Sequence, residues 1–139
     1  MTTRVHTLKR AQLKERLDVL CERLDVTQAL SVDPIRFVRE YTNPQDQEVV
    51  AFIAALLAYG RVSAIGSAIK DVLERVDGSP YACLISDEHE RAAARFEGFV
   101  YRFTRGQDLT ALWLGLGALC REHGSVGEAL KGWDDPQAT

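Results

Sequence analysis

Few side chains in this sequence are spaced for proton transfer or metal binding. Asp46 and Glu48 are two residues apart, so on a helix they point about 200° from each other and cannot share one substrate. Carboxylates near the start of a helix oppose the positive end of its dipole, and we interpret both as capping residues. His6, His89 and His123 lack the spacing of metal ligands. We predict no catalytic residue and no metal site.

Arginine and aromatic side chains form the more suggestive combination. Tyr59 and Arg61 end a long apolar segment, and Arg102 and Arg105 lie in or beside an aromatic one. Guanidinium and aromatic groups together can contact phosphates and stack on bases. The alternative is that these arginines lie in solvent or pair with carboxylates, and the residues alone favour it. We keep Tyr59, Arg61, Arg102 and Arg105 as candidate nucleic-acid contacts.

The aromatic segment F-E-G-F-V-Y-R-F, residues 96–103, is predicted to be irregular, followed by a turn at residues 104–106. We expect its aromatic side chains to anchor the segment in the core rather than to form a base-stacking platform. These are Phe96, Phe99, Tyr101 and Phe103.

Helices must position these residues, because strand signals are almost absent. Asn43-Pro44 predicts a helix start, and Gly60 predicts a helix end. Between them, residues 49–58 are apolar without interruption. A helix with no polar face must be covered on all sides, and this one is too short for a bilayer, which needs about 20 residues. We predict an all-α fold, an orthogonal multi-helix bundle around a buried central helix at about residues 46–59.

Two apolar faces are predicted to need a partner. Leucines recur at spacings of four, three and four residues near the N-terminus, and Trp113 lies on a broad apolar helical face. Exposed apolar patches usually mark interaction sites. The candidate contacts with another chain or a second copy are Leu13, Leu17, Leu20, Leu24 and Trp113.

The composition fits one soluble domain. The chain has 139 residues, 46% of them hydrophobic, and a net charge of −3, which excludes a generally basic nucleic-acid binder but not a local basic patch. Cys21, Cys83 and Cys120 form no C-x-x-C pair, so we expect a reduced, cytoplasmic protein without a membrane segment or cofactor. We predict one helical domain, complete or incomplete, over residues 1–131, and a polar tail over 132–139.

Several segments, in order, resemble the N-terminal half of a bacterial family, domain-of-unknown-function family 2400. They are D-P-I-R-F-V-R-E-Y (33–41), D-Q-E-V-V-A-F-I-A-A-L-L-A-Y-G-R (46–61), S-P-Y (79–81), F-E-G-F-V-Y-R-F (96–103) and G-S-V-G-E-A-L (124–130). The family has no established activity. Its members resemble the all-helical fold of helix-hairpin-helix DNA glycosylases, an analogy of fold rather than of activity.

The resemblance implies that residues 51–58 match the buried helix of the first glycosylase subdomain and that residues 59–61 lie near the DNA. Members of the family continue with segments that we do not find here, so we expect a chain truncated after about residue 130. The catalytic carboxylate of a glycosylase would lie in the missing half. We therefore expect a nucleic-acid-associated module without activity of its own. A helical module for protein interaction or self-association is the alternative.

Overall fold

The computed structural model describes residues 10–131. The chain divides into two compact units, residues 1–31 and residues 32–139, and each is described by itself. The predicted single domain over residues 1–131 stays a prediction, and the predicted tail over residues 132–139 lies outside the described residues. Within the described part, no helix has the length and apolar character needed to cross a membrane.

The first unit contains α1 (Arg10–Arg23) and most of α2 (Val26–Val32). Asp25 begins α2, because its carboxylate accepts a hydrogen bond from the backbone N–H of Gln28 at 3.0 Å. No residue of α1 is buried. The four leucines of the predicted stripe are 45–62% exposed, so this helix presents apolar side chains to solvent.

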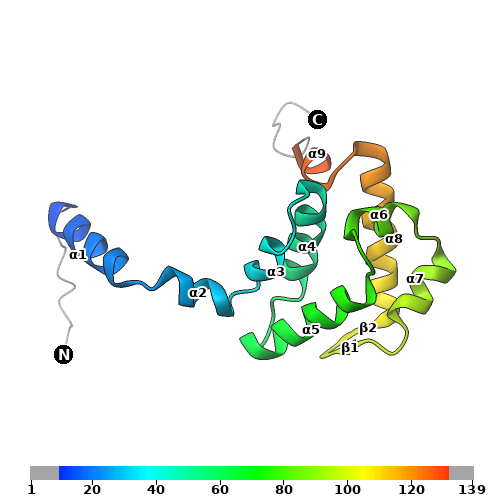
Figure 1. Ribbon diagram of the computed structural model, residues 1–139, viewed down its shortest axis with the longest axis horizontal. Helices are drawn as coiled ribbons and strands as arrows, with labels where there is room; N and C mark the ends of the chain where they lie inside the picture. The colour runs from blue at the N-terminus through cyan, green and yellow to red at the C-terminus, as the bar shows by residue number, and fades with distance from the viewer. Residues whose placement is uncertain (1–9, 132–139) are drawn as a thin grey trace, which may run out of the picture. The chain divides into compact units, whose positions relative to one another are not determined.

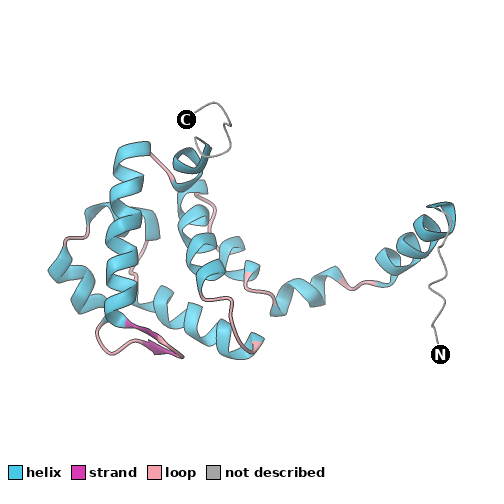
Figure 2. Cartoon of the chain, turned by 180° about the vertical axis from the view of Figure 1, so that it is seen from behind, coloured by secondary structure: helices cyan, strands magenta, loops and turns pink. Residues whose placement is uncertain are grey.

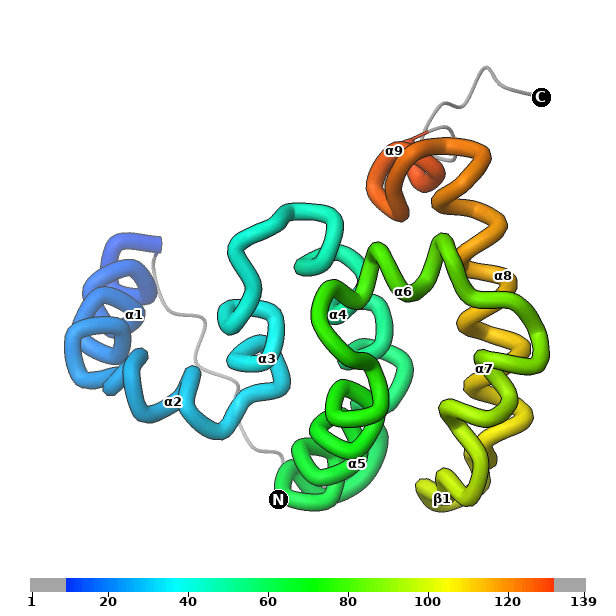
Figure 3. The backbone as a smooth tube through the Cα atoms, turned by 45° about the vertical axis from the view of Figure 1, so that its right-hand side comes forward, coloured from blue at the N-terminus to red at the C-terminus, as the bar shows by residue number. Residues whose placement is uncertain are grey.

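Over residues 32–131 the second unit is helical apart from one short hairpin, which confirms the predicted all-α class. Its elements are α3 (Ile35–Arg39), α4 (Pro44–Leu56), α5 (Val62–Arg75), α6 (Pro80–Ser86), α7 (His89–Phe96), β1 (Val100–Tyr101), β2 (Thr104–Arg105), α8 (Gly106–His123) and α9 (Val126–Lys131). Helix α6 contacts both α4 and α8, and α9 contacts the same two helices (Figures 1 and 3). Helix α7 packs on α8 and α5.

Helix α4 begins where the sequence predicts. The side chain of Asn43 accepts a hydrogen bond from the backbone N–H of Gln45 at 2.9 Å, and Pro44 takes the first helical position. The helix is not covered on all sides, however. Val49, Val50, Ile53 and Ala54 are buried, whereas the opposite face is exposed. In its second half the exposed residues are Ala51, Ala55 and Leu56. Since two of the three are alanines, this face leaves little apolar area in water.

The core lies between α4, α5, α6, α7 and α8. Its most deeply buried large side chains are Phe96, Phe99, Ile69, Leu84, Val49, Val50 and Val72. Trp113 is only 2% exposed and packs edge-on against Phe96, with ring centroids 5.5 Å apart. The prediction that Trp113 contacts a partner is therefore wrong for the folded unit, because α8 turns this face inward. Cys120 is also buried, and burial raises the pKa of its thiol.

The carboxylates predicted to cap α4 bind other helices instead. Asp46 is buried and accepts hydrogen bonds from Ser79 Oγ at 2.6 Å and the Tyr81 backbone N–H at 2.8 Å, at the start of α6. Glu48 accepts a hydrogen bond from the Gly127 backbone N–H of α9 at 2.9 Å. Both join α4 to segments far away in the sequence, and the cap of α4 is Asn43.

The carbonyl oxygen of Gly124 provides two further anchors for the segment that leads into α9. It accepts hydrogen bonds from Tyr81 Oη at 2.6 Å and from Gln45 Nε2 at 3.0 Å. The end of α8 and all of α9 are thereby held by side chains of α4 and α6.

A second buried carboxylate, Asp87, lies between α6 and α7. It accepts hydrogen bonds from Arg95 Nε at 3.0 Å, Arg95 Nη2 at 3.2 Å and Trp113 Nε1 at 3.0 Å. Arg95 in turn donates to the carbonyl oxygen of Arg75 at 2.6 Å. The carboxylate raises the pKa of Arg95, because its hydrogen bonds favour the charged guanidinium. The polar side chains of this cluster therefore bond to one another and to the backbone within the fold.

Candidate functional site

A β-hairpin lies at the edge of the second unit (Figures 1 and 2) and contains two of the arginines predicted as nucleic-acid contacts, Arg102 and Arg105. Strand β1 pairs with β2 in antiparallel fashion, with Val100 opposite Arg105 and Tyr101 opposite Thr104. The predicted irregular segment therefore ends in a hairpin whose turn is Arg102-Phe103. The turn predicted at residues 104–106 is wrong, because these residues form β2 and begin α8.

Tyr59, at the exit of α4, is fixed to this hairpin by hydrogen bonds in both directions. Its hydroxyl lies 2.6 Å from Thr104 Oγ1 and donates to the carbonyl oxygen of Tyr101 at 3.3 Å. The Tyr101 hydroxyl donates to the carbonyl oxygen of Tyr59 at 2.6 Å. The two rings are 5.0 Å apart. These contacts join residues more than 40 positions apart and give the hairpin a defined place on the helical unit.

Phe103 extends from the turn into solvent. Its side chain is 77% exposed, and its ring stacks on Tyr59 with centroids 4.7 Å apart and planes inclined by 11°. The prediction that aromatic residues anchor this segment is confirmed for Phe96, Phe99 and Tyr101, which are buried, and is wrong for Phe103. A residue at the tip of a two-residue turn lies beyond the reach of the core.

Arg102 has a left-handed backbone conformation, with φ of 53°. Its guanidinium lies against Gly60, whose own φ is 120°. A Cβ atom at Gly60 would lie 2.8 Å from Arg102 Nε, closer than such atoms approach in proteins. Because Gly60 has no side chain, the Arg102 guanidinium can lie against the backbone that follows α4.

Arg61 and Arg105 complete the surface. Both are exposed; Arg61 precedes α5, and the backbone N–H of Arg105 donates to Asp108 Oδ2 at 2.7 Å at the start of α8. Among the ion pairs formed within residues 10–131, none involves Arg61, Arg102 or Arg105. We call these residues the hairpin-tip surface: Tyr59, Arg61, Arg102, Phe103 and Arg105.

Sequence reasoning selected four of these five residues and missed Phe103 as an exposed group. The signal available in the sequence was the alternation of aromatic and polar residues within V-Y-R-F-T-R, residues 100–105. Alternation of this kind is typical of a short hairpin. The turn lacks the glycine or asparagine that usually marks such hairpins, since Arg102 takes the left-handed position.

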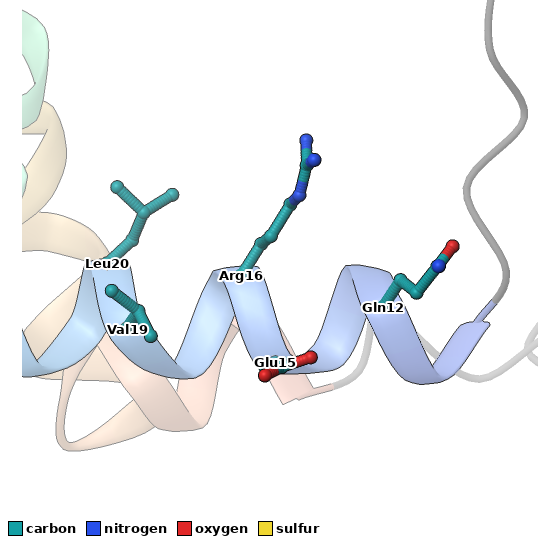
Figure 4. Close-up of a pocket in the computed structure, with 5 residues that line it drawn as sticks. All are labelled: Gln12, Glu15, Arg16, Val19 and Leu20. Atoms are coloured by element: carbon teal, nitrogen blue, oxygen red, sulfur yellow. The ribbon is translucent and has the colours of Figure 1, made fainter.

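Other surfaces offer weaker sites. Figure 4 shows a hollow on the first unit whose labelled residues all belong to α1 and point outward from it. One helix alone cannot enclose a ligand. In the part of the chain that the structure describes, no group of three or more histidine, cysteine, aspartate or glutamate side chains is placed to hold a metal ion. His89 and His123 are exposed, and His6 lies outside the described residues.

The structure thus defines a helical protein with one small hairpin that carries arginines and aromatic residues. The family described as "Protein of unknown function (DUF2400)" matches residues 33–138, which is more than half of the chain. The chain therefore belongs to this family, and the match contains α3 to α9 and the whole hairpin-tip surface. It continues past Leu130, where we expected the resemblance to end. Neither a curated protein nor a solved structure matches the chain.

Proposed function

We propose that this chain is a nucleic-acid-binding module that contacts phosphates through the hairpin-tip surface and has no catalytic activity of its own. One observation carries the proposal: three exposed arginines, Arg61, Arg102 and Arg105, lie in or near an exposed aromatic turn, and within residues 10–131 none of them forms an ion pair. The chain as a whole carries a net charge of −3. A local group of free positive charges on an acidic protein favours a specific anionic partner over general attraction to polyanions.

The geometry suits a phosphate backbone. Arg102 is held at the hairpin turn, Arg61 adjoins the glycine against which Arg102 lies, and Arg105 is at the base of the hairpin. Guanidinium groups bind phosphate oxygens with two parallel hydrogen bonds. Contacts of this kind position a nucleic acid without reading its sequence.

The salt dependence of binding tests the proposal. Affinity for a labelled oligonucleotide is measured by fluorescence anisotropy across a salt series, for the full chain and for the double variant Arg61→Gln/Arg102→Gln. Each lost phosphate contact should reduce the slope of log affinity against log salt by about 0.7 for a single strand or about 0.9 for a duplex. The double variant should therefore lose roughly twice that slope.

A matched control makes this result specific. The double variant Arg39→Gln/Arg91→Gln removes the same charge from exposed positions on α3 and α7, and it should retain the wild-type slope. Equal slopes for all three proteins, or equal losses in both variants, would contradict a role for the hairpin-tip surface.

A second candidate function is protein association through α1. It rests on the four leucines of the first unit, which are 45–62% exposed; three lie on α1 and Leu24 follows it directly. Their partner would be another chain or a second copy, and the mass of the protein in solution distinguishes an associating chain from a monomer.

A further inference from the structure

Phe103 is an exposed ring held in a fixed position. One face of the ring stacks on Tyr59 at 4.7 Å, yet the residue remains 77% exposed. The opposite face must therefore be in solvent. Tyr59 is itself immobilised, because its hydroxyl is bonded to Thr104 Oγ1 and the Tyr101 carbonyl oxygen. The two rings form a short stack whose outer end is vacant.

A positively charged residue lies in the same turn as this ring. Arg102 precedes Phe103 in the turn and has a left-handed backbone that glycine would adopt without strain. An arginine at such a position is uncommon. A flat apolar surface and a guanidinium are thus presented together by one two-residue turn.

We infer that the outer face of Phe103 stacks on an unpaired base of a single-stranded nucleic acid while Arg102 and Arg61 contact the adjoining phosphates. This inference rests on the proposed function and names its substrate class. A base inside a duplex has both faces covered by its neighbours, so only an unpaired base can extend the Tyr59–Phe103 stack. Aromatic stacking on successive bases is a common mode of single-strand binding.

Apart from the arginines, the hydrogen-bonding groups beside the Tyr59–Phe103 stack already have partners. The Thr104 hydroxyl faces Tyr59, and the carbonyl oxygens of Tyr59 and Tyr101 already accept hydrogen bonds from the two tyrosines. Stacking tolerates every base because each has a flat face. Stacking on Phe103 should therefore not select one base over another. An apolar protein surface fits less well, since it would remove the flanking guanidinium groups from water without a counter-charge.

The test compares three probes of equal length: an oligothymidylate strand, an abasic strand with the same phosphates, and a duplex. The wild-type chain should bind oligothymidylate most tightly. Phe103→Leu keeps an apolar side chain but removes the ring, and should bind oligothymidylate about 5- to 150-fold more weakly. Its affinity for the abasic strand and its salt slope should not change, because no charge is lost. Phe103→Trp should retain binding.

Val100→Ala is the matched control, because Val100 lies in the same hairpin and is 59% exposed; it should bind like the wild type. If the wild type binds none of the probes, the proposed function fails together with this inference. If it binds with the salt dependence of phosphate contacts but Phe103→Leu changes nothing, the stacking inference alone is overturned. If Phe103→Leu instead abolishes a concentration-dependent dimer and leaves nucleic-acid affinity intact, the ring binds protein and the inference is wrong.

Discussion

Replacing Asp87 by alanine should destabilise the protein more than any surface substitution. The Asp87 side chain is 1% exposed, and it accepts two hydrogen bonds from Arg95 and one from Trp113 Nε1. Alanine would leave a guanidinium and an indole N–H inside the fold without their acceptor. Removing one partner of a buried ion pair costs about 3–5 kcal/mol.

The lower end of that range applies here. Arg95 is 15% exposed and keeps its hydrogen bond to the Arg75 carbonyl oxygen, so water and backbone replace part of the lost interaction. We therefore expect Asp87→Ala to lower the free energy of unfolding by about 3 kcal/mol. Asp87→Asn retains the shape and one acceptor oxygen but loses the charge, and should cost about 1.5–3 kcal/mol.

Urea unfolding followed by far-ultraviolet circular dichroism measures these differences. With a slope of about 1–3 kcal/mol per molar urea, the midpoint for Asp87→Ala should fall by about 1–3 M. Asp71→Ala is the control: Asp71 lies 2.8 Å from Arg75 Nε but is 45% exposed, and a pair of this kind contributes at most about 1 kcal/mol. The reasoning is refuted if Asp87→Ala costs less than Asp71→Ala.

Two further predictions concern the hairpin-tip surface and α1. Gly60→Ala should destabilise the chain by about 1–2 kcal/mol, because φ at Gly60 is 120° and the new Cβ would lie 2.8 Å from Arg102 Nε. The substitution should also weaken oligonucleotide binding. Unchanged binding would show that the position of Arg102 does not matter for affinity. If α1 mediates self-association, light scattering should give a mass above that of the 15.5 kDa chain, and Leu17→Lys/Leu20→Lys should restore the monomer. A wild-type chain that is monomeric at all concentrations would exclude a second copy as the partner of α1.

The parts of the fold that were predictable from the sequence depend on neighbouring residues. Asn43-Pro44 places a capping side chain before a proline and begins α4 as predicted. Ser79-Pro80 has the same two features and begins α6. The side chains of Asp46 and Asp87 have partners many positions away. Local pattern cannot distinguish such a carboxylate from a cap or a solvated charge, because the distinction depends on tertiary packing.

Helices that are apolar all round hide which face is buried. Residues 109–119 of α8 contain a single polar side chain, so the sequence alone could not show that Trp113 faces the core. For the candidate site, residue type identified Tyr59 and the three arginines, and the structure adds that Tyr59 and the turn Arg102-Phe103 are in contact. The binding of nucleic acid at this surface stays a prediction.

The anchoring of α9 has a consequence for the order in which the protein folds. This helix has six residues, too few to be stable alone. Glu48 and Gln45 hold it and the preceding Gly124 across 79 positions of the chain. Closing so long a loop costs conformational entropy. We expect that cost to be offset only once α4 and α6 are already assembled. Helix α9 should therefore form last, and its amides should exchange with solvent before those of α4, through openings that leave the rest of the unit folded.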